Sequence, residues 1–200
     1  MNFIRNLIWR AIAWIVTIPA VTDWLIARAS RTPYKHITNR DGSSIYMGRW
    51  WLLNPYPNDG DKEGWTKWER SWRRHLPSVR VHHIRRPDAD GPCHDHPWNA
   101  RTIVLRGWYV EERPHHLVPN GVSWFPVWTH DDRLRAGFHR ARGYTGRLLF
   151  GEYHRIRGVS SDGVWTLFIT WKKRGTWGFL VDGVKVPWRK YLGLDAKEPA

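Results

Sequence analysis

The stretch GPCHDHPWNARTIVLRG, residues 91–107, is the most informative part of this sequence for the fold. It places His94 and His96 two residues apart, and an extended backbone turns the side chains of such a pair to the same side. The β-branched run that follows predicts a strand that ends at Gly107. We therefore expect two imidazoles that can bind one metal ion, directly before a strand.

Further strands are expected after Pro77, where short segments rich in β-branched and aromatic residues alternate with Gly, Pro and Asp. Such segments at short spacing predict an all-β sandwich or barrel. The pair Asp182-Gly183 predicts a tight hairpin between the last two strands. The strand-forming segments are residues 79–86, 101–112, 121–128, 146–157, 164–171, 177–181 and 185–188.

The 200 residues are enough for one domain of ordinary size with a real core. We expect an apolar helical segment at 1–30, a loop-rich region at 31–78, a β-barrel at 79–192 and a C-terminal tail at 193–200. The loop-rich region is predicted to hold one short helix. Its three indoles at helical spacing form one face that we expect to dock on the barrel: Trp65, Trp68 and Trp72.

The N-terminal segment is too short for a simple membrane span. Only twelve uncharged residues separate Arg10 from Asp23, and Pro19 interrupts them, whereas a spanning helix needs about 20 apolar residues. No small-residue cleavage site indicates a secretory signal. Two interpretations stay open: two short helices that pack on the domain or on a second subunit as a homodimer, or an interfacial helix with Trp9, Trp14 and Trp24 at the lipid headgroups.

The chain is strongly basic, with 32 Lys and Arg against 18 Asp and Glu and a net charge of +14. This favours nucleic acid or an anionic membrane surface as a partner, although a merely solvated basic surface has the same composition. The single cysteine, Cys93, excludes an internal disulfide and a four-cysteine zinc site. We expect a cytoplasmic protein, with contact to the inner membrane face left open. The sequence contains no phosphate-binding glycine loop, no Gly-x-Ser-x-Gly and no His-Glu-x-x-His.

A second histidine segment, FGEYHRIRGV (150–159), places His154 58 residues after His96. Together with His94, His96 and Gly107 it resembles the two motifs of the cupin superfamily. The resemblance implies a mainly β fold, a double-stranded β-helix or jelly-roll barrel, with His94, His96 and His154 as metal ligands. The motif's glutamate position is Ala100 here, so the resemblance is to the three-histidine site of thiol dioxygenases.

That branch implies Fe(II), with Zn, Mn or Ni as other divalent ions, and a small-molecule substrate. It also implies an arginine that holds the substrate and a tyrosine near the metal. The catalytic candidates are Tyr109, which we prefer, and Arg101 and Arg155. A further resemblance, to uncharacterised cupin-like bacteriophage proteins, implies an often acidic residue at position 99, so Asn99 is expected to be at most a weak ligand.

Over residues 24–192 the chain is also similar to uncharacterised cupin-like proteins of tailed bacteriophages and their hosts. The similarity rests on MGRWWLLNPY (47–56), HDHPW (94–98), HRI (154–156), WTLFITW (165–171), WGF (177–179) and VPWRKY (186–191). It implies no reaction. Three functions are therefore weighed: a non-haem Fe(II) dioxygenase, which would be an oxidoreductase; a non-catalytic cupin for binding or assembly, peripheral to a membrane in one version; and a nucleic-acid-associated modifier.

Overall fold

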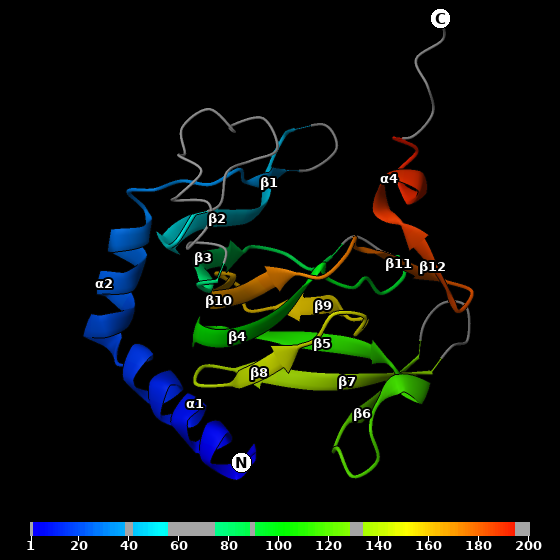
Figure 1. Ribbon diagram of the computed structural model, residues 1–200, viewed down its shortest axis with the longest axis horizontal. Coiled ribbons are helices and arrows are strands. Elements are labelled where there is room, and N and C mark those ends of the chain that lie inside the picture. The colour runs from blue at the N-terminus through cyan, green and yellow to red at the C-terminus, as the bar shows by residue number, and fades with distance from the viewer. Residues whose placement is uncertain (1, 39–41, 56–74, 89–90, 129–133, 195–200) are drawn as a thin grey trace, which may run out of the picture.

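The computed structural model describes residues 2–38, 42–55, 75–88, 91–128 and 134–194 (Figure 1). The predicted helix with Trp65, Trp68 and Trp72, and residues 195–200 of the expected tail, lie outside the described residues.

Two antiparallel sheets form the body of the molecule, and a hairpin extends it. The first sheet has six strands, the second has four, and the hairpin is a separate two-stranded sheet. In spatial order, the first sheet comprises β1 (Ile37–Thr38), β2 (Ile45–Leu53), β3 (Ser78–Ile84), β10 (Val164–Lys173), β4 (Trp98–Arg106) and β8 (Thr145–Leu148). The second comprises β6 (Phe125–Trp128), β7 (Leu134–Ala141), β5 (Trp108–Pro114) and β9 (Arg155–Val159), and the hairpin comprises β11 (Gly178–Val181) and β12 (Val184–Pro187).

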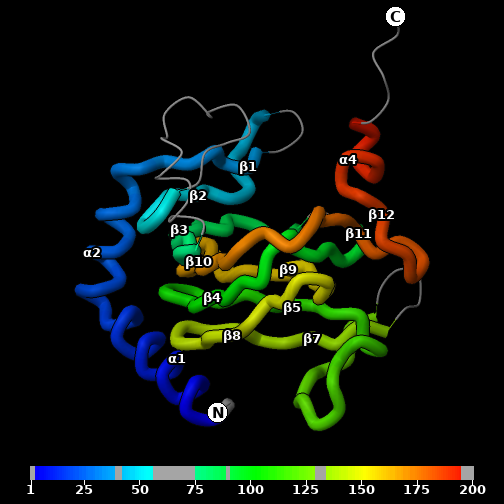
Figure 2. Tube along the Cα trace, in the orientation of Figure 1, coloured from blue at the N-terminus to red at the C-terminus, as the bar shows by residue number. Residues whose placement is uncertain are grey.

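The chain passes back and forth between the two large sheets, from β4 to β5, from β7 to β8, and again through β9 to β10. Their inner faces share a core in which Val104 and Val164 from the first sheet meet Tyr109 and Ile156 from the second. This mainly β jelly-roll arrangement is the fold that the sequence predicts. Figure 2 shows the β11–β12 hairpin and helix α4 (Trp188–Tyr191) on the side away from the N-terminal helices.

The crossing from β4 to β5 depends on Gly107. Its φ is +79°, and an added Cβ would lie 2.4 Å from Oγ of Ser160 and 2.7 Å from the backbone oxygen of Gly163. Gly107→Ala is therefore expected to lower the free energy of unfolding by about 3 kcal/mol, through left-handed strain and overpacking. Urea denaturation measures this loss.

Gly143→Ala is the matched control, because Gly143 also has a positive φ, +86°, but nothing lies within 4 Å of an added Cβ. Strain alone predicts a loss of about 1 kcal/mol at this position. Equal losses in the two variants would contradict a specific steric role for Gly107.

The N-terminal helices pack on the outer face of the six-stranded sheet. Helices α1 (Asn2–Val16) and α2 (Pro19–Ala29) follow the side of the barrel and bend at Pro19 (Figure 1). Ala13, Leu25 and Ala29 join a buried cluster with strand residues that include Ile103 and Leu105. Neither helix alone has the length and apolarity of a membrane span, although the pair, bent by 83°, passes that test together.

The first sheet begins earlier in the chain than the sequence suggests. β2 pairs with β3 along nearly its whole length, so residues 45–53 belong to the barrel and not to a loop-rich region that ends at 78. Gly48 lies within this strand, and the low strand propensity of glycine weakens a prediction of β2 from the sequence. Gly48 is required because the Trp50 ring lies so close that a Cβ on Gly48 would be 2.4 Å from it.

Strand β7 is also absent from the prediction. Its small and basic residues interrupt the alternation of apolar and polar side chains that indicates a strand. The predicted hairpin at Asp182-Gly183 is confirmed, with φ values of +50° and +78° at its two turn residues. A further one-turn 3-10 helix, η2 (His115–Leu117), follows β5.

Candidate functional site

The two histidine segments meet through the backbone. The amide of His94 donates to the carbonyl of His154, and the amide of His154 donates back to the carbonyl of His94, both at 2.9 Å. A pair that exchanges both bonds is a directly opposed antiparallel pair. The other edge of the His94 segment lies against β11, where Asp95 N donates to the carbonyl of Gly178 at 3.0 Å. The segment is therefore held on both edges.

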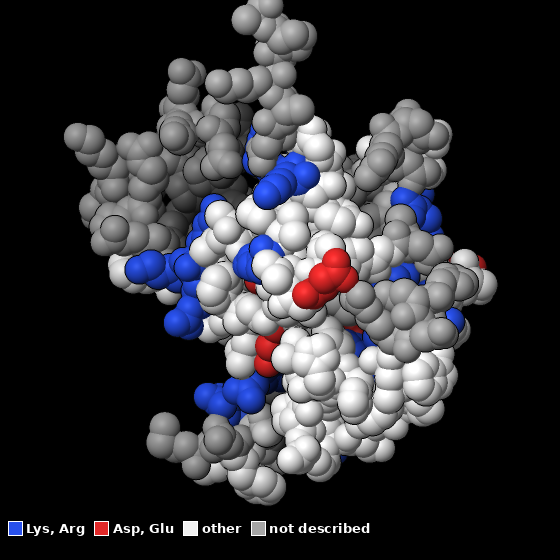
Figure 3. Space-filling model, turned by 90° about the vertical axis from the view of Figure 1, so that its right-hand side faces the viewer, with Lys and Arg blue, Asp and Glu red and all other residues white. Residues whose placement is uncertain are grey.

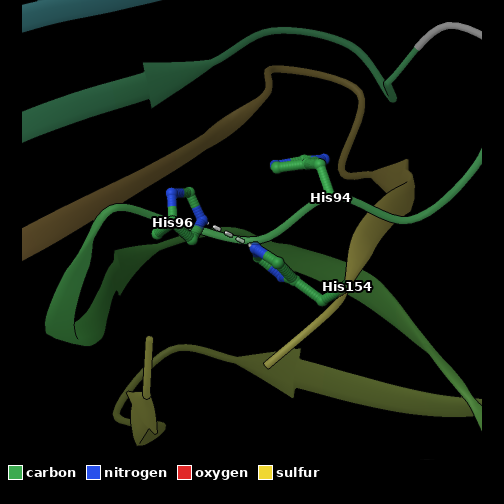
Figure 4. Close-up of side chains that lie close together, drawn as sticks. All are labelled: His94, His96 and His154. Carbon is green, nitrogen blue, oxygen red and sulfur yellow. Dashed lines mark hydrogen bonds between the residues drawn. The ribbon is translucent and has the colours of Figure 1, made fainter. Parts of the chain in front are cut away.

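The three predicted imidazoles converge (Figure 4). One ligand nitrogen from each of His94, His96 and His154 lies within 4.8 Å of the other two, and Nε2 of His96 is 2.8 Å from Nε2 of His154. Within the described ranges this is the only group of three or more His, Cys, Asp or Glu side chains with metal-ligand spacing. The structure thus brings together the three residues that the sequence singles out.

Asp95 shows why the two histidines of the first segment share a side. Its carboxylate points away from the two imidazoles and is fully buried. It accepts a hydrogen bond from Gly178 N at 2.7 Å and forms an ion pair with Lys185. This contact fixes the extended conformation between His94 and His96. It also ties the hairpin β11–β12 to the site.

A buried carboxylate lies directly behind the cluster. Oε1 of Glu111, on β5, is 3.2 Å from Nδ1 of His154, and Glu111 is balanced by Arg113 at 2.9 Å and Arg140 at 2.8 Å. A carboxylate at Nδ1 favours the tautomer with its proton there, which leaves Nε2 free to bind a metal. Sequence reasoning misses Glu111; two consecutive glutamates inside the apolar strand WYVEERP are the signal that could have found it.

His94 has a looser acidic neighbour. Its Nδ1 lies 4.0 Å from Oδ2 of Asp88, the atom that also accepts a hydrogen bond from Ile156 N at 2.8 Å. Tyr46 donates to the other oxygen of Asp88. Asp88 therefore links β2, the start of β9 and the candidate ligand His94.

Burial favours the neutral form of two of these imidazoles, those of His94 and His96. It lowers the pKa of His94 to about 4, although Asp88 acts in the other direction, and it lowers the pKa of His96 well below the usual value with help from the neighbouring histidines. Burial alone would raise the pKa of Glu111, but the contact with His154 and the two arginines bring it well below its ordinary range. Neutral imidazole is the form that binds a metal.

These shifts predict a loss of stability in mild acid. In the metal-free protein the unfolded histidines take up protons below about pH 6.5, whereas native His94 resists protonation until about pH 4. The free energy of unfolding is therefore expected to fall as the pH drops from 6.5 toward 4. Urea denaturation in EDTA at several pH values measures the slope, and His94→Ala/His96→Ala should flatten it; an equal slope in both proteins would contradict this origin.

The predicted catalytic residues occupy three different places. Tyr109 is buried in the inner core on β5, two residues before Glu111, and burial raises its pKa well above the usual value. Arg155 adjoins His154, but its guanidinium donates to Gly91 O at 2.8 Å and lies 3.7 Å from Glu112. The roles suggested for both residues stay predictions.

Arg101 lies away from the histidines. Its guanidinium donates to Oγ1 of Thr145 at 3.0 Å and sits 4.7 Å from the centre of the Trp9 ring on α1. It belongs to the face of β4 that packs on the N-terminal helices, where Ile103 is also found. The structure does not bring Arg101 to the cluster.

Two aromatic contacts extend the site along the inside of the first sheet. The Phe168 ring lies 5.8 Å from the His96 ring and 5.0 Å, stacked, from the ring of His82. Nε2 of His82 is buried and has no hydrogen-bond partner within the described residues. His83, in contrast, faces outward and stacks on Trp165 at 4.1 Å, so only His82 of these two neighbours points inward.

Asn99 and Trp171 have structural partners, and Cys93 is buried. Asn99 accepts a hydrogen bond from Phe150 N at 3.0 Å, and Trp171 packs edge-on against Trp9. Cys93 is buried, which raises the pKa of its thiol to about 11 and makes it a poor nucleophile.

Comparisons with solved structures find matches of low sequence identity. No protein-family model matches the chain, and no curated protein matches it. A putative mannose-6-phosphate isomerase from Ralstonia eutropha is 12% identical, with a TM-score of 0.35 over 48% of this chain and 74% of that one. An oxalate decarboxylase mutant from Bacillus subtilis is 9% identical, with a TM-score of 0.44 over 84% of this chain and 32% of that one. The protein HppE with Fe(II) is 9% identical, with a TM-score of 0.42 over 70% and 55%.

Proposed function

We propose that this chain is a metal-dependent jelly-roll oxygenase in which His94, His96 and His154 hold Fe(II) and a small molecule is oxidised with dioxygen. One observation carries the proposal: three imidazoles from two distant segments converge within ligand distance, and the group contains no carboxylate. Three protein ligands leave coordination positions open for other molecules.

The donor set fits a divalent first-row metal. Imidazole suits iron, zinc, copper and nickel, and three neutral ligands leave the ion more positive charge than carboxylates would. A bound ion would supply Lewis acidity and, in the case of iron, redox chemistry. Zinc, manganese and nickel are the other candidates, and elemental analysis of the purified protein separates them.

The chain's own residues prepare and enclose the site. Glu111 orients His154 through Nδ1, and the hydrogen-bonded pair of His94 and His154 fixes the spacing of their side chains. Trp177 and Phe179 place their rings 6.1 Å from that of His94 and cover it with apolar surface. Within the proposal Tyr109 and Arg155 are the candidate catalytic residues, since the guanidinium of Arg101 lies against Trp9 of α1.

Nitric oxide, a stable analogue of dioxygen, tests whether iron in this site has an open position. Protein loaded with Fe(II) without air is expected to give the high-spin electron paramagnetic resonance signal of an iron nitrosyl, and His154→Ala should lose it. His139→Ala is the matched control, since this exposed histidine contacts the Trp108 ring, 5.3 Å away and tilted, and not the site. Bound iron without a nitrosyl signal would contradict the oxygenase and favour a non-catalytic binding module.

The nucleic-acid alternative has less support. On the side of the molecule shown in Figure 3, the described Lys and Arg side chains lie at several separate places and do not form one patch. Binding of DNA or RNA through the net charge would weaken steeply with salt. An affinity that does not change with salt would exclude this alternative.

A further inference from the structure

Helix α1 has two apolar faces, and the barrel covers only one of them. Ala13 is fully buried against the six-stranded sheet, and Trp9, Ile12 and Val16 pack beside it. A helix on the surface of a domain normally exposes polar residues on its outer side. The outer side of α1 is instead mostly apolar, with Arg5, Asn6 and Arg10 as its exposed polar residues.

The outer face of α1 is a continuous apolar stripe. Phe3 is 80% exposed and Trp14 71% exposed, and the positions between them recur at three- and four-residue spacing, which lines them along one side. Beyond the bend, Trp24 on α2 is 62% exposed. The exposed members of the stripe on α1 are Phe3, Ile4, Leu7, Ile8, Trp14 and Ile15. Exposed apolar surface of this extent marks an interaction site.

Positive charge surrounds the stripe. Arg5 and Arg10 are the only charged residues of α1, and both are exposed. Arg28 and Arg31 add exposed positive charge at the end of α2. The single acidic residue among the first 38, Asp23, forms an ion pair with Arg106.

These positive charges favour anionic lipid over a second copy of this chain as the partner of the stripe. A second copy of this chain on the stripe would bring the same arginines together at a net charge of +14 per chain, and like charges across an interface are unfavourable. Anionic lipid headgroups complement them, while arginine stems and indole rings suit the boundary between headgroups and acyl chains.

The packing of the two helices on the barrel also limits how α1 can lie relative to a lipid bilayer. Ala13, Leu25 and Ala29 are buried against the sheet, so lipid cannot surround the helices while they stay on the barrel. The 83° bend between the two helices likewise disfavours a straight passage. We propose that the outer stripe of α1, together with Trp24, docks on the surface of an anionic lipid bilayer with α1 lying in the plane of the interface.

Co-sedimentation of the full chain with lipid vesicles tests this proposal. Vesicles of phosphatidylcholine with about one third phosphatidylserine should pellet the wild type at low salt, and phosphatidylcholine alone should do so weakly. Leu7→Gln/Trp14→Gln should lower the partition coefficient about 10-fold or more, because apolar area no longer leaves water. Trp128→Gln is the matched control, since Trp128 is an equally exposed indole on β6, 65% exposed, and should bind as the wild type does.

A second double variant distinguishes a loss of lipid binding from a loss of folding. Ile4→Gln/Ile8→Gln changes the same stripe, and circular dichroism with the iron content shows whether the barrel is intact. Arg10→Glu should weaken binding to anionic vesicles, whereas Lys190→Glu on α4 should not. Wild-type protein that stays in the supernatant, or stripe variants that pellet unchanged, would overturn the proposal. A wild-type dimer that the stripe variants dissociate, without vesicle binding, would identify a second copy as the occupant instead.

Discussion

His96→Ala is expected to lower the affinity of the protein for Fe(II) by more than about 100-fold, since the loss of a direct ligand should exceed the roughly 10–100-fold cost of losing an outer partner. His96 contributes the nitrogen that lies 2.8 Å from Nε2 of His154, at the centre of the cluster. Anaerobic titration against a competing chelator measures the affinity.

His139→Ala is again the control for this variant, because it removes an exposed imidazole that contacts Trp108. Its affinity should equal that of the wild type. His96→Ala protein that is folded by circular dichroism and still binds Fe(II) with wild-type affinity would contradict the three-histidine site.

Glu111→Gln is expected to lower the metal affinity about 10–100-fold while His94, His96 and His154 all remain. The amide no longer carries the charge that holds the proton on Nδ1 of His154. The variant should also lower the free energy of unfolding by about 3 kcal/mol, because Arg113 and Arg140 keep their buried positions without a full charge partner.

Glu112→Gln separates these two effects. Glu112 is as deeply buried as Glu111 and pairs with Arg135 and Arg157, but no histidine contact is found for it among the described residues. It should lose similar stability and keep the wild-type metal affinity. If both variants lose metal affinity equally, Glu111 acts through stability alone and not by orienting His154.

The sequence predicts the candidate ligands because their geometry is local. Two histidines separated by one residue in an extended segment face the same way whatever surrounds them. Their meeting with His154 is a long-range event, and only the resemblance to a two-motif family indicates it. The network of Glu111 with Arg113 and Arg140 cannot be predicted in the same way, since its members come from two strands that the sequence does not pair.

The position of Arg101 could not be predicted from the spacing of residues along its strand. Odd positions on β4 do share a face, but that face packs on the N-terminal helices, as the burial of Ile103 and Leu105 beside Ala13 shows. The chain then turns at Gly107 into the other sheet. Arg101 and Tyr109 both have odd numbers, but they belong to different sheets and do not share a face. Tyr109 lies in the inner core.

The iron content of the untagged, full-length protein after anaerobic loading and desalting tests the central claim most directly. Plasma mass spectrometry should find close to stoichiometric iron in the wild type and in His139→Ala, and near-background iron in His94→Ala and His154→Ala. Background iron in the wild type, or stoichiometric iron in both site variants, would contradict the assignment of His94, His96 and His154 as metal ligands.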